Sequence, residues 1–330
     1  MKALICPSLG PVENLEVMDV EEPVAGRGEA VVEVAYAALN FFDTLIIEGK
    51  YQLKPEPPFS PAGEFSGRIV ALGPDAGGFA VGDRVMGSSG YGAARERIAI
   101  AVTRLAHVPD GLPLDKAAGL SIAYGTTIHA LKQRAEMKPG ETLVVLGASG
   151  GVGLAAVEIG AAMGARVIAC ASSDDKLEFA RRYGAAETVN YATQDLRGRL
   201  KELTGGNGVD VVYDPVGGAL TEPALRSLAW KGRLLVIGFA SGEIPKPPLN
   251  LVLLKGCDIR GVYWGDFTAR EPDANRDNMS QLLRWAESGA LSVHIHAKYR
   301  IEDYEKAFEA ISKRQALGKV LLQFKEIAPE

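Results

Sequence analysis

Residues 142–153 read TLVVLGASGGVG, a short apolar run that leads into a turn of glycine and alanine. Thr142–Leu146 is typical of a buried parallel strand, and the residues after the turn are typical of a helix. Such a turn forms an anion site, because free backbone N–H groups and the helix dipole converge where no side chain blocks approach. The spacing matches G-x-G-x-x-G, with Ala148, Gly150 and Gly153 at the small positions. The stretch predicts a dinucleotide-binding unit, although turn packing alone also favours glycine.

Length and charge narrow the class of protein. A chain of 330 residues is long enough for two domains. Its net charge of −5 argues against a nucleic-acid surface, which is normally basic. The N-terminus MKALICPSLG lacks the long apolar run of a secretion signal, so we expect a cytoplasmic protein. The three cysteines, Cys6, Cys170 and Cys257, have no metal-ligand spacing and are expected to be buried hydrophobic residues.

The pattern of the chain changes near residue 120. Residues 1–120 read as β-structure, with short runs such as Ala30–Ala35, Ser66–Leu72 and Arg97–Ala101 between glycine and proline signals. Strands and helices then alternate, which predicts a doubly wound parallel sheet. The expected strands are Thr142–Leu146, Arg166–Cys170, Glu187–Val189, Val209–Tyr213, Arg233–Ile237 and Asp258–Gly261. The expected helices are Ile122–Arg134, Gly151–Gly164, Lys176–Tyr183, Leu196–Thr204, Leu220–Ser227 and Asn278–Glu287.

The tail of the chain does not continue this alternation. Ile301–Arg314 is typical of an amphipathic helix, and KVLLQF at 319–324 reads as a strand. We expect this strand to return to the β-rich first part. The fold class is therefore α/β, with a Rossmann sheet and a second, β-rich domain.

The end of the second expected strand bears on which dinucleotide is bound. A carboxylate there would bind the ribose 2′-hydroxyl and repel a 2′-phosphate. The position falls near Ala171, which is not acidic, and Ser172, Ser173 and Lys176 follow. The pattern favours NADPH over NADH. The acidic pair at 174–175 leaves an alternative open, since one carboxylate could fold back to the ribose or cap the next helix.

Further cofactor contacts are expected at other strand ends. Tyr191 follows the third strand and either lines the same site or is a half-buried surface residue. The loops DPVGG at 214–218 and GFASG at 238–242 permit close backbone approach to a flat ring, although loop geometry alone would also explain their glycines. The full expected set is Ala148, Ser149, Gly150, Gly151, Val152, Gly153, Ser172, Ser173, Lys176, Tyr191, Gly238, Phe239, Ala240 and Lys319.

Several segments together resemble one family over essentially the full chain. They are ALNFFDTLIIEGKY (38–51), PAGEFSGRIVALG (61–73), VGDRVMG (81–87), RAEMKPGETLVVLGASGGVG (134–153), VVYDPVGG (211–218), GRLLVIGFASGEIP (232–245), PLNLVLLKG (248–256), GVYWGDF (261–267) and GKVLL (318–322). The sequence resembles the zinc-free quinone oxidoreductases of the medium-chain dehydrogenase/reductase superfamily, the zeta-crystallin type. The resemblance implies a GroES-like catalytic domain over 1–121 completed by 266–330, a Rossmann domain over 122–265, NADPH, and a homodimer joined through Rossmann edge strands.

The metal ligands of the superfamily's zinc enzymes are missing. Zinc members place a cysteine and a histidine at positions that resemble Asn40 and Gly63 here. No cysteine or histidine lies anywhere in 39–106, so neither a catalytic nor a four-cysteine zinc site can be built there. We therefore predict a metal-independent enzyme.

Without a Lewis acid, alcohol oxidation is difficult but hydride reduction of an electron-poor acceptor is not. The resemblance implies a site over the nicotinamide, between the domains. Tyr51, Asn40 and Thr127 are the expected catalytic residues: Tyr51 as a proton donor or an aromatic wall, Asn40 as a donor to a carbonyl or as a loop brace. The expected substrate-binding residues are Phe41, Asp43, Tyr124, Trp264 and Phe267, with Asp43 favoured as a brace of its loop and the aromatics also readable as core. Quinones are the favoured substrates, and enones or enoyl thioesters are the alternative substrates. A non-catalytic structural or RNA-binding protein is the alternative function.

Overall fold

A computed structural model describes residues 1–324, which form two compact units. Unit 1 contains Met1–Ala123, Met279–Glu287 and the chain from Val293 onward. Unit 2 contains Tyr124–Asn278 and Ser288–Ser292. The boundaries at 121/122 and 265/266 remain predictions from the sequence, and the last six residues of the expected segment 266–330 lie outside the described part.

Unit 2 is built on a six-stranded parallel sheet with the order β10-β9-β8-β11-β12-β13. The strands are β8 (Thr142–Leu146), β9 (Arg166–Ala171), β10 (Glu187–Asn190), β11 (Val209–Asp214), β12 (Leu228–Val236) and β13 (Asp258–Gly261). All six expected strands are confirmed, and β12 begins five residues earlier than its apolar run indicated, with Lys231 at positive φ inside it. The order reverses between β8 and β11, as in a doubly wound sheet.

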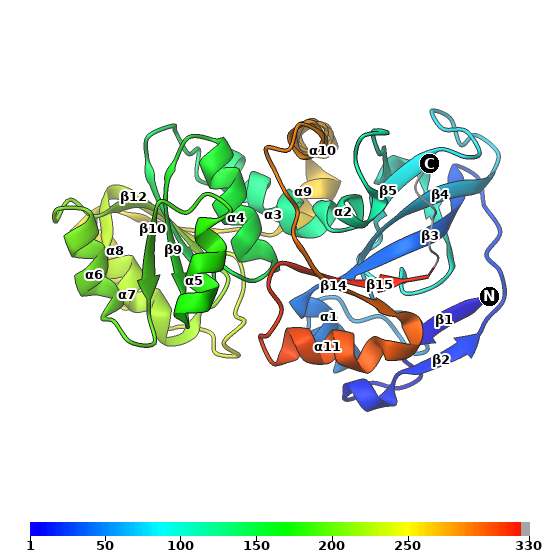
Figure 1. Ribbon diagram of the computed structural model, residues 1–330, viewed down its shortest axis with the longest axis horizontal. Helices are drawn as coiled ribbons and strands as arrows, with labels where there is room; N and C mark the ends of the chain where they lie inside the picture. Colours follow the sequence, from blue (N-terminus) through cyan, green and yellow to red (C-terminus); the bar gives the residue numbers. More distant parts are fainter. Residues whose placement is uncertain (325–330) are drawn as a thin grey trace. The chain divides into compact units, whose positions relative to one another are not determined.

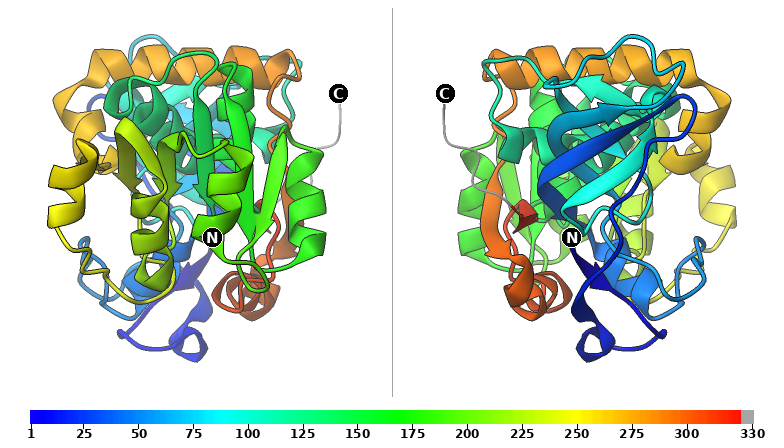
Figure 2. Two further views of the ribbon diagram at one scale, coloured as in Figure 1. Left: turned by 90° about the vertical axis from the view of Figure 1, so that its left-hand side faces the viewer. Right: turned by 90° about the vertical axis from the view of Figure 1, so that its right-hand side faces the viewer.

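Helices cover both faces of this sheet (Figures 1 and 2). They are α4 (Gly151–Ala162), α5 (Asp174–Arg181), α6 (Leu196–Leu203), α7 (Thr221–Arg226) and α8 (Asn250–Lys255). Apolar residues of α6, α7 and α8, including Leu200, Leu225 and Leu251, pack with Val144 and Ile168 of the sheet in one buried cluster. Alternating crossovers thus bury the central strands on both faces, which is why these strands are apolar throughout.

The remaining helical segments after residue 119 are less regular, and parts of two of them, 120–123 and Met279–Glu287, belong to unit 1. The expected helix Ile122–Arg134 is present but divided into a π-turn (η3, Leu120–Tyr124), α3 (Gly125–Ile128) and a second π-turn (η4, His129–Arg134). A short 3-10 turn, η5 (Gly218–Leu220), precedes α7. Two helices follow β13: α9 (Trp264–Arg270) and α10 (Pro272–Glu287). The expected helix at 278–287 is the second half of α10, which begins at proline, a favoured first residue of a helix.

One buried arginine connects separate parts of unit 2. Arg233 of β12 donates from Nε to the carbonyl of Ala135 at 3.0 Å and forms two hydrogen bonds with Glu141, at 2.9 and 2.7 Å. It also donates to the carbonyl of Asp210 at 3.2 Å. Its planar guanidinium satisfies four acceptors at one point, which a single ammonium cannot do with the same geometry.

Unit 1 is built on a mainly antiparallel sheet with the order β14-β15-β3-β4-β5-β7, and β6 also pairs with β3. The strands are β3 (Glu29–Leu39), β4 (Glu64–Leu72), β5 (Arg84–Ser88), β6 (Arg97–Ala101), β7 (Leu105–His107), β14 (Ile295–Arg300) and β15 (Lys319–Gln323). A separate pair is formed by β1 (Lys2–Ile5) and β2 (Glu16–Asp19). The expected return of the tail is confirmed, because β15 pairs with β3 with Val320 opposite Leu39.

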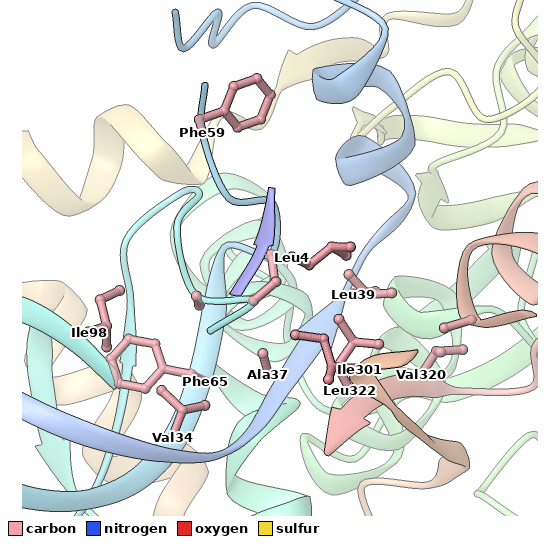
Figure 3. Close-up of a cluster of buried hydrophobic side chains, with 14 of the residues drawn as sticks. Leu4, Val34, Ala37, Leu39, Phe59, Phe65, Ile98, Ile301, Val320 and Leu322 are labelled. Atoms are coloured by element: carbon pink, nitrogen blue, oxygen red, sulfur yellow. The ribbon is translucent and has the colours of Figure 1, made fainter. Parts of the chain in front are cut away.

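The core of unit 1 joins residues that are far apart in the chain. Figure 3 shows Leu39, Ile301, Val320 and Leu322 close together, with Phe65 and Val34 in the same cluster. All of these side chains are buried. The tail is therefore part of the hydrophobic core of the first 120 residues.

Helices also occur within the first 120 residues, which the sequence analysis read as β-structure. They are α1 (Phe41–Ile47), α2 (Leu114–Ala118) and the short 3-10 turns η1 (Val12–Asn14) and η2 (Val102–Arg104). The tail carries the 3-10 turn η6 (Ile301–Asp303) and α11 (Tyr304–Ser312). The start of α1 is fixed by a capping box between Asn40 and Asp43. Helix α11 confirms the expected amphipathic helix of the tail, although it is shorter than 301–314.

Candidate functional site

The glycine turn between β8 and α4 has the geometry that the sequence predicted. Gly147 adopts a positive φ of 60°, and Gly150 is the N-cap of α4. A Cβ on Gly153 would lie 2.1 Å from the carbonyl oxygen of Gly147, so only glycine lets the helix approach the turn this closely. The backbone N–H of Ala148 donates to the carbonyl of Cys170 at 3.1 Å, which ties the turn to β9. The first N–H groups of α4 have no partner within the helix and are available to an anion.

The end of β9 carries the residues expected near the ribose. Ser172 is exposed and precedes the N-cap of α5, which is Ser173 rather than either aspartate. Asp174 accepts a hydrogen bond from Asn190 Nδ2 at 2.8 Å, so its carboxylate has a partner across the β10 end. The half-buried Lys176 lies one turn into α5. The serine cap corrects the idea that an aspartate caps α5.

Tyr191 is held close to the same strand end. Its backbone N–H donates to the carbonyl of Ala171 at 3.1 Å, and its side chain packs against the buried cluster of unit 2. The structure therefore brings Ala171 and Tyr191 together. Whether the tyrosine ring contacts a cofactor stays a prediction.

The two glycine loops after β11 and β12 are joined to each other. Asp214 accepts hydrogen bonds from the N–H groups of Val216 and Gly217 at 2.9 and 2.8 Å, which fixes the first loop. The N–H of Ala240 donates to the carbonyl of Pro215 at 3.0 Å, and that of Ser241 donates to Val216 at 2.8 Å. The two predicted loops therefore form one surface at the carboxyl edge of the sheet. This edge is where ligands bind in doubly wound sheets.

A cavity of about 430 Å³ opens beside these loops in unit 2. Its lining includes Gly218 and Ala219 from the turn after β11, together with Arg197, Arg226 and Lys246. Arg226 is already paired with Glu222 on α7. The turn, the loops and the helix N-terminus fit a dinucleotide, because they offer backbone N–H groups and close approach at one sheet edge.

Two residues predicted for the reaction are buried inside unit 2. The Tyr124 hydroxyl donates to Glu158 Oε2, and burial beside this carboxylate raises the pKa of Tyr124 far above its usual value. The second oxygen of Glu158 accepts from the backbone N–H of Ser292 at 2.7 Å. Thr127 is buried, and its Oγ1 lies 2.8 Å from the hydroxyl of Tyr213. Burial raises the pKa of Tyr213. Both predicted residues hold the sheet and helices together here; the reactive roles remain predictions.

The two aromatic residues of α9 differ in their surroundings. Phe267 is buried, and its ring stacks on His129 with centroids 3.8 Å apart. Burial lowers the pKa of His129. Trp264 is half-buried, and its indole Nε1 has no acceptor within residues 1–324. Phe267 therefore has a packing role in unit 2, and its contact with a substrate stays a prediction.

Unit 1 contains a buried ion pair beside the expected catalytic loop. The Lys319 ammonium lies 2.8 Å from Glu64 Oε1 and 2.6 Å from Asn40 Oδ1, and it also donates to the carbonyl of Leu39 at 3.3 Å. Asn40 Nδ2 donates to the same Glu64 oxygen at 2.9 Å, and the Ile122 N–H donates to Glu64 Oε2 at 2.7 Å. The side chains of Lys319 and Glu64 are only 2% and 0% exposed.

This cluster changes how two predicted residues are interpreted. Lys319 was expected to bind the cofactor, but its three donors are matched by three oxygen atoms of unit 1. Asn40 is half-buried and braces the loop through both ends of its amide, as one of its two expected roles required. The sequence reasoning missed Glu64. The only signal for it was an acidic residue inside an apolar strand, 255 residues away from its partner.

Asp43 is part of the same cluster. Its Oδ2 accepts from the backbone N–H of Asn40 at 2.7 Å, while Oδ1 is buried without a partner within the described chain. Burial raises the pKa of this carboxyl group to about 7. The structure supports the expectation that Asp43 braces the loop.

The aromatic residues of the loop lie around the start of α1. Phe41 is the first residue of the helix and is half-buried. The Tyr51 ring stacks on Phe42 with centroids 5.3 Å apart and packs against the core of unit 1. Tyr51 is itself half-buried. Its role as proton donor or wall stays a prediction.

Comparison with known proteins places the chain in a family. A family model described as "Alcohol dehydrogenase GroES-like domain" matches residues 26–110, and one described as "Zinc-binding dehydrogenase" matches residues 151–288. The chain is 38% identical to quinone oxidoreductase-like protein 2 of Rattus norvegicus, over 98% of this chain and 92% of the relative. The chain belongs to the quinone oxidoreductase family of medium-chain dehydrogenases/reductases. The resemblance found in the sequence is thereby confirmed.

Other members of the quinone oxidoreductase family are similar over the same extent. The quinone oxidoreductase of Pseudomonas aeruginosa is 32% identical over 95% of this chain and 96% of its own. The crystal structure of the Escherichia coli quinone oxidoreductase, described as complexed with NADPH, superimposes with a TM-score of 0.91 at 28% identity. That match covers 98% of this chain and 100% of the other. The α/β fold with a GroES-like domain is confirmed.

The zinc ion in the name of one family model does not fit the residues of this member. Asn40, which the sequence resemblance places where zinc members have a cysteine, is hydrogen-bonded through its amide to Lys319 and Glu64. A Cβ on Gly63, which the same resemblance places where zinc members have a histidine, would lie 2.9 Å from the carbonyl oxygen of Gly90. Within residues 1–324 no group of three His, Cys, Asp or Glu side chains is arranged to hold a metal ion.

Among the same residues, none of the helices has both the length and the apolar composition that a membrane span requires.

Proposed function

We propose that this protein is an NADPH-dependent, metal-independent reductase that transfers hydride to quinones or similar electron-poor carbonyl acceptors. The observation that supports the proposal most is the turn of β8 and α4, where Gly153 packs against Gly147 at a distance that excludes any side chain. The coenzyme supplies the hydride when it is bound. The buried ammonium of Lys319 beside Asn40 is consistent with a reaction that uses no zinc.

In this proposal the chain binds and orients the two reactants. The N–H groups at the start of α4 hold the pyrophosphate, and the joined loops at 214–218 and 238–242 support the nicotinamide end. Ser172, Ser173 and Lys176 accommodate the 2′-phosphate. Tyr51 either donates to the oxygen that gains charge or forms an aromatic wall.

The proposal is tested by following NADPH oxidation with quinones, enones and enoyl thioesters as acceptors. We expect the fastest turnover with quinones and no change after prolonged treatment with a chelator. A preference for enoyl thioesters would assign the alternative substrate class, and activity lost to the chelator but restored by zinc would refute the metal-independent mechanism. Tyr51→Phe slows reduction if the hydroxyl donates to oxygen, and leaves the rate unchanged if the ring is only a wall.

The preference for NADPH is tested at Ser172, which is exposed and makes no cap. A carboxylate here repels the 2′-phosphate and accepts the 2′-hydroxyl. We expect Ser172→Asp to raise the KM for NADPH at least tenfold and to lower the KM for NADH. Asn207→Asp is the matched control, because it adds the same charge in the exposed loop before β11. Equal affinity of the unaltered protein for NADPH and NADH would remove the basis of this assignment.

We further propose that two copies associate through the β13 edge of unit 2. This strand ends the sheet with one side unpaired in the described chain. Nearby Trp230, Leu253 and Leu254 are each more than 70% exposed, which is unusual for large apolar side chains outside interfaces. Antiparallel pairing of the two edges would satisfy the backbone and bury these residues.

Light scattering coupled to size exclusion measures the oligomeric state. We expect a dimer, and Leu253→Lys should convert it to a monomer. Val81→Lys is the control, because Val81 is also a largely exposed apolar residue but lies in unit 1. A monomeric unaltered protein would refute the dimer.

A further inference from the structure

The amide of Asn40 is held in one orientation by the charges around it. Lys319 carries only donors, so it must face the amide oxygen, and Glu64 carries acceptors, so it must face Nδ2. Rotating the amide by 180° would place its NH₂ group against the ammonium and its oxygen against the carboxylate. Both hydrogen bonds would be lost. The buried pair therefore fixes the direction of each N–H of Asn40.

One of these N–H groups remains available. Nδ2 has two hydrogens, and the one directed to Glu64 is used. The other has no acceptor among residues 1–324. Lys319, Glu64 and Asp43 are almost fully buried, whereas Asn40 is half-buried. Asn40 is thus the most exposed of these four residues, and its remaining N–H is a donor.

Lys319 also changes the strength of this donor. A hydrogen bond from an ammonium to the amide oxygen draws electron density from the nitrogen, because bonds in a chain polarise one another in a low dielectric. The stem of Lys319 fits because Gly119 has no side chain: a Cβ there would lie 3.0 Å from Lys319 Cγ. The buried ammonium of Lys319 therefore contacts the neutral amide of Asn40, which is the more exposed of the two groups.

We propose that Lys319 is a positioning residue that acts through Asn40, whose free N–H donates to the carbonyl oxygen of the acceptor as negative charge develops on it. This inference rests on the proposed reductase function. The quinone accepts a hydride from NADPH and a proton from solvent, giving the hydroquinone and NADP⁺. A preorganised donor at the oxygen stabilises the charge that appears between these two events.

The experiment compares Asn40→Ala, Lys319→Met and the double variant with 1,4-naphthoquinone as substrate. Asn40→Ala should lower kcat by about 100-fold, the loss typical of one such donor, with KM changed less than threefold. Lys319→Met should lower kcat by at least tenfold, and the double variant should be no slower than Asn40→Ala. Lys298→Met is the control. It removes another lysine ion pair of unit 1, with Asp115, and should leave kcat unchanged.

A second readout does not depend on turnover. In the complex with NADP⁺ and 1,4-naphthoquinone, Raman difference spectra should show a carbonyl stretch shifted to lower frequency. The shift should disappear in Asn40→Ala and shrink in Lys319→Met. Each of three results would overturn the inference. They are an unchanged kcat in Asn40→Ala, a loss of kcat in the double variant equal to the product of the two single losses, and a carbonyl stretch with no shift in the unaltered protein. If Lys319→Met does not fold, Asn40→Ala decides alone. An unaltered protein that reduces no acceptor would instead refute the proposed function.

Discussion

Replacing Lys319 by methionine should destabilise unit 1 far more than replacing any exposed lysine. The ammonium and the Glu64 carboxylate are 2.8 Å apart and almost completely buried. Removing one partner leaves a buried charge without compensation, which costs about 3–5 kcal/mol. Loss of the Lys298–Asp115 pair, which is partly exposed, should cost only about 0.2–1 kcal/mol. The contrast between two lysines of one sheet isolates the effect of burial.

The partner substitution makes this prediction quantitative. Glu64→Gln alone leaves the ammonium buried with neutral acceptors and should also cost about 3–5 kcal/mol. The double variant removes both charges, so its cost should be well below the sum of the two single costs. A coupling energy of several kcal/mol between the two sites is the expected result.

Urea unfolding followed through one tryptophan gives the measurement for unit 1 alone. Trp285 lies in the segment Met279–Glu287 of unit 1, whereas Trp230 and Trp264 belong to unit 2. In a background of Trp230→Phe and Trp264→Phe, fluorescence reports on unit 1. A loss below about 1 kcal/mol for Lys319→Met, or strictly additive costs, would show that the pair is not the buried, coupled unit described above.

Three other predictions concern separate sites. Burial raises the pKa of Asp43 to about 7, so the folded protein retains a proton that the unfolded chain releases near pH 4. The contribution of this group to the free energy of unfolding should be fully present below pH 4 and should be lost as the pH rises to about 7. Asp43→Asn should abolish this trend in urea titrations. Gly153→Ala places a methyl group 2.1 Å from the Gly147 carbonyl and should weaken NADPH binding in fluorescence titrations, with normal binding contradicting the packing argument. Arg233→Lys should lower the melting temperature, because an ammonium cannot reproduce the two bonds to Glu141; an unchanged melting temperature would argue against this.

Local patterns predicted the nucleotide-binding part of the fold well. The strand at 142–146 and the edge strand at 258–261 have the bounds that the sequence indicated. Both are short runs between clear turn signals, so periodicity and breakers were sufficient. The helix expected at 122–134 was less well predicted, because its two π-turns are invisible to a pattern based on 3.6 residues per turn.

The loop before α1 shows what local patterns cannot supply. Its helix was overlooked, although Asn40 and Asp43 have the spacing of a capping box. Lys319 was expected to bind the cofactor, and a lone lysine before an apolar strand carries no information on its partner in unit 1. That partner, Glu64, is 255 residues away, and only the register of the sheet brings the two together. Contacts of this kind depend on the completed fold.

The place of β15 in the sheet has a consequence for synthesis on the ribosome. Its lysine contacts the carbonyl of Leu39, a residue translated 280 positions earlier. At ordinary elongation rates the first strands emerge roughly 15 to 55 s before the strand that covers β3 is made. Until then only the first half of this edge of β3 has a native neighbour, because β6 pairs with Glu29–Glu33 while Tyr36–Leu39 wait for β15. The end of β3 therefore keeps unpaired backbone groups for most of the time that translation takes.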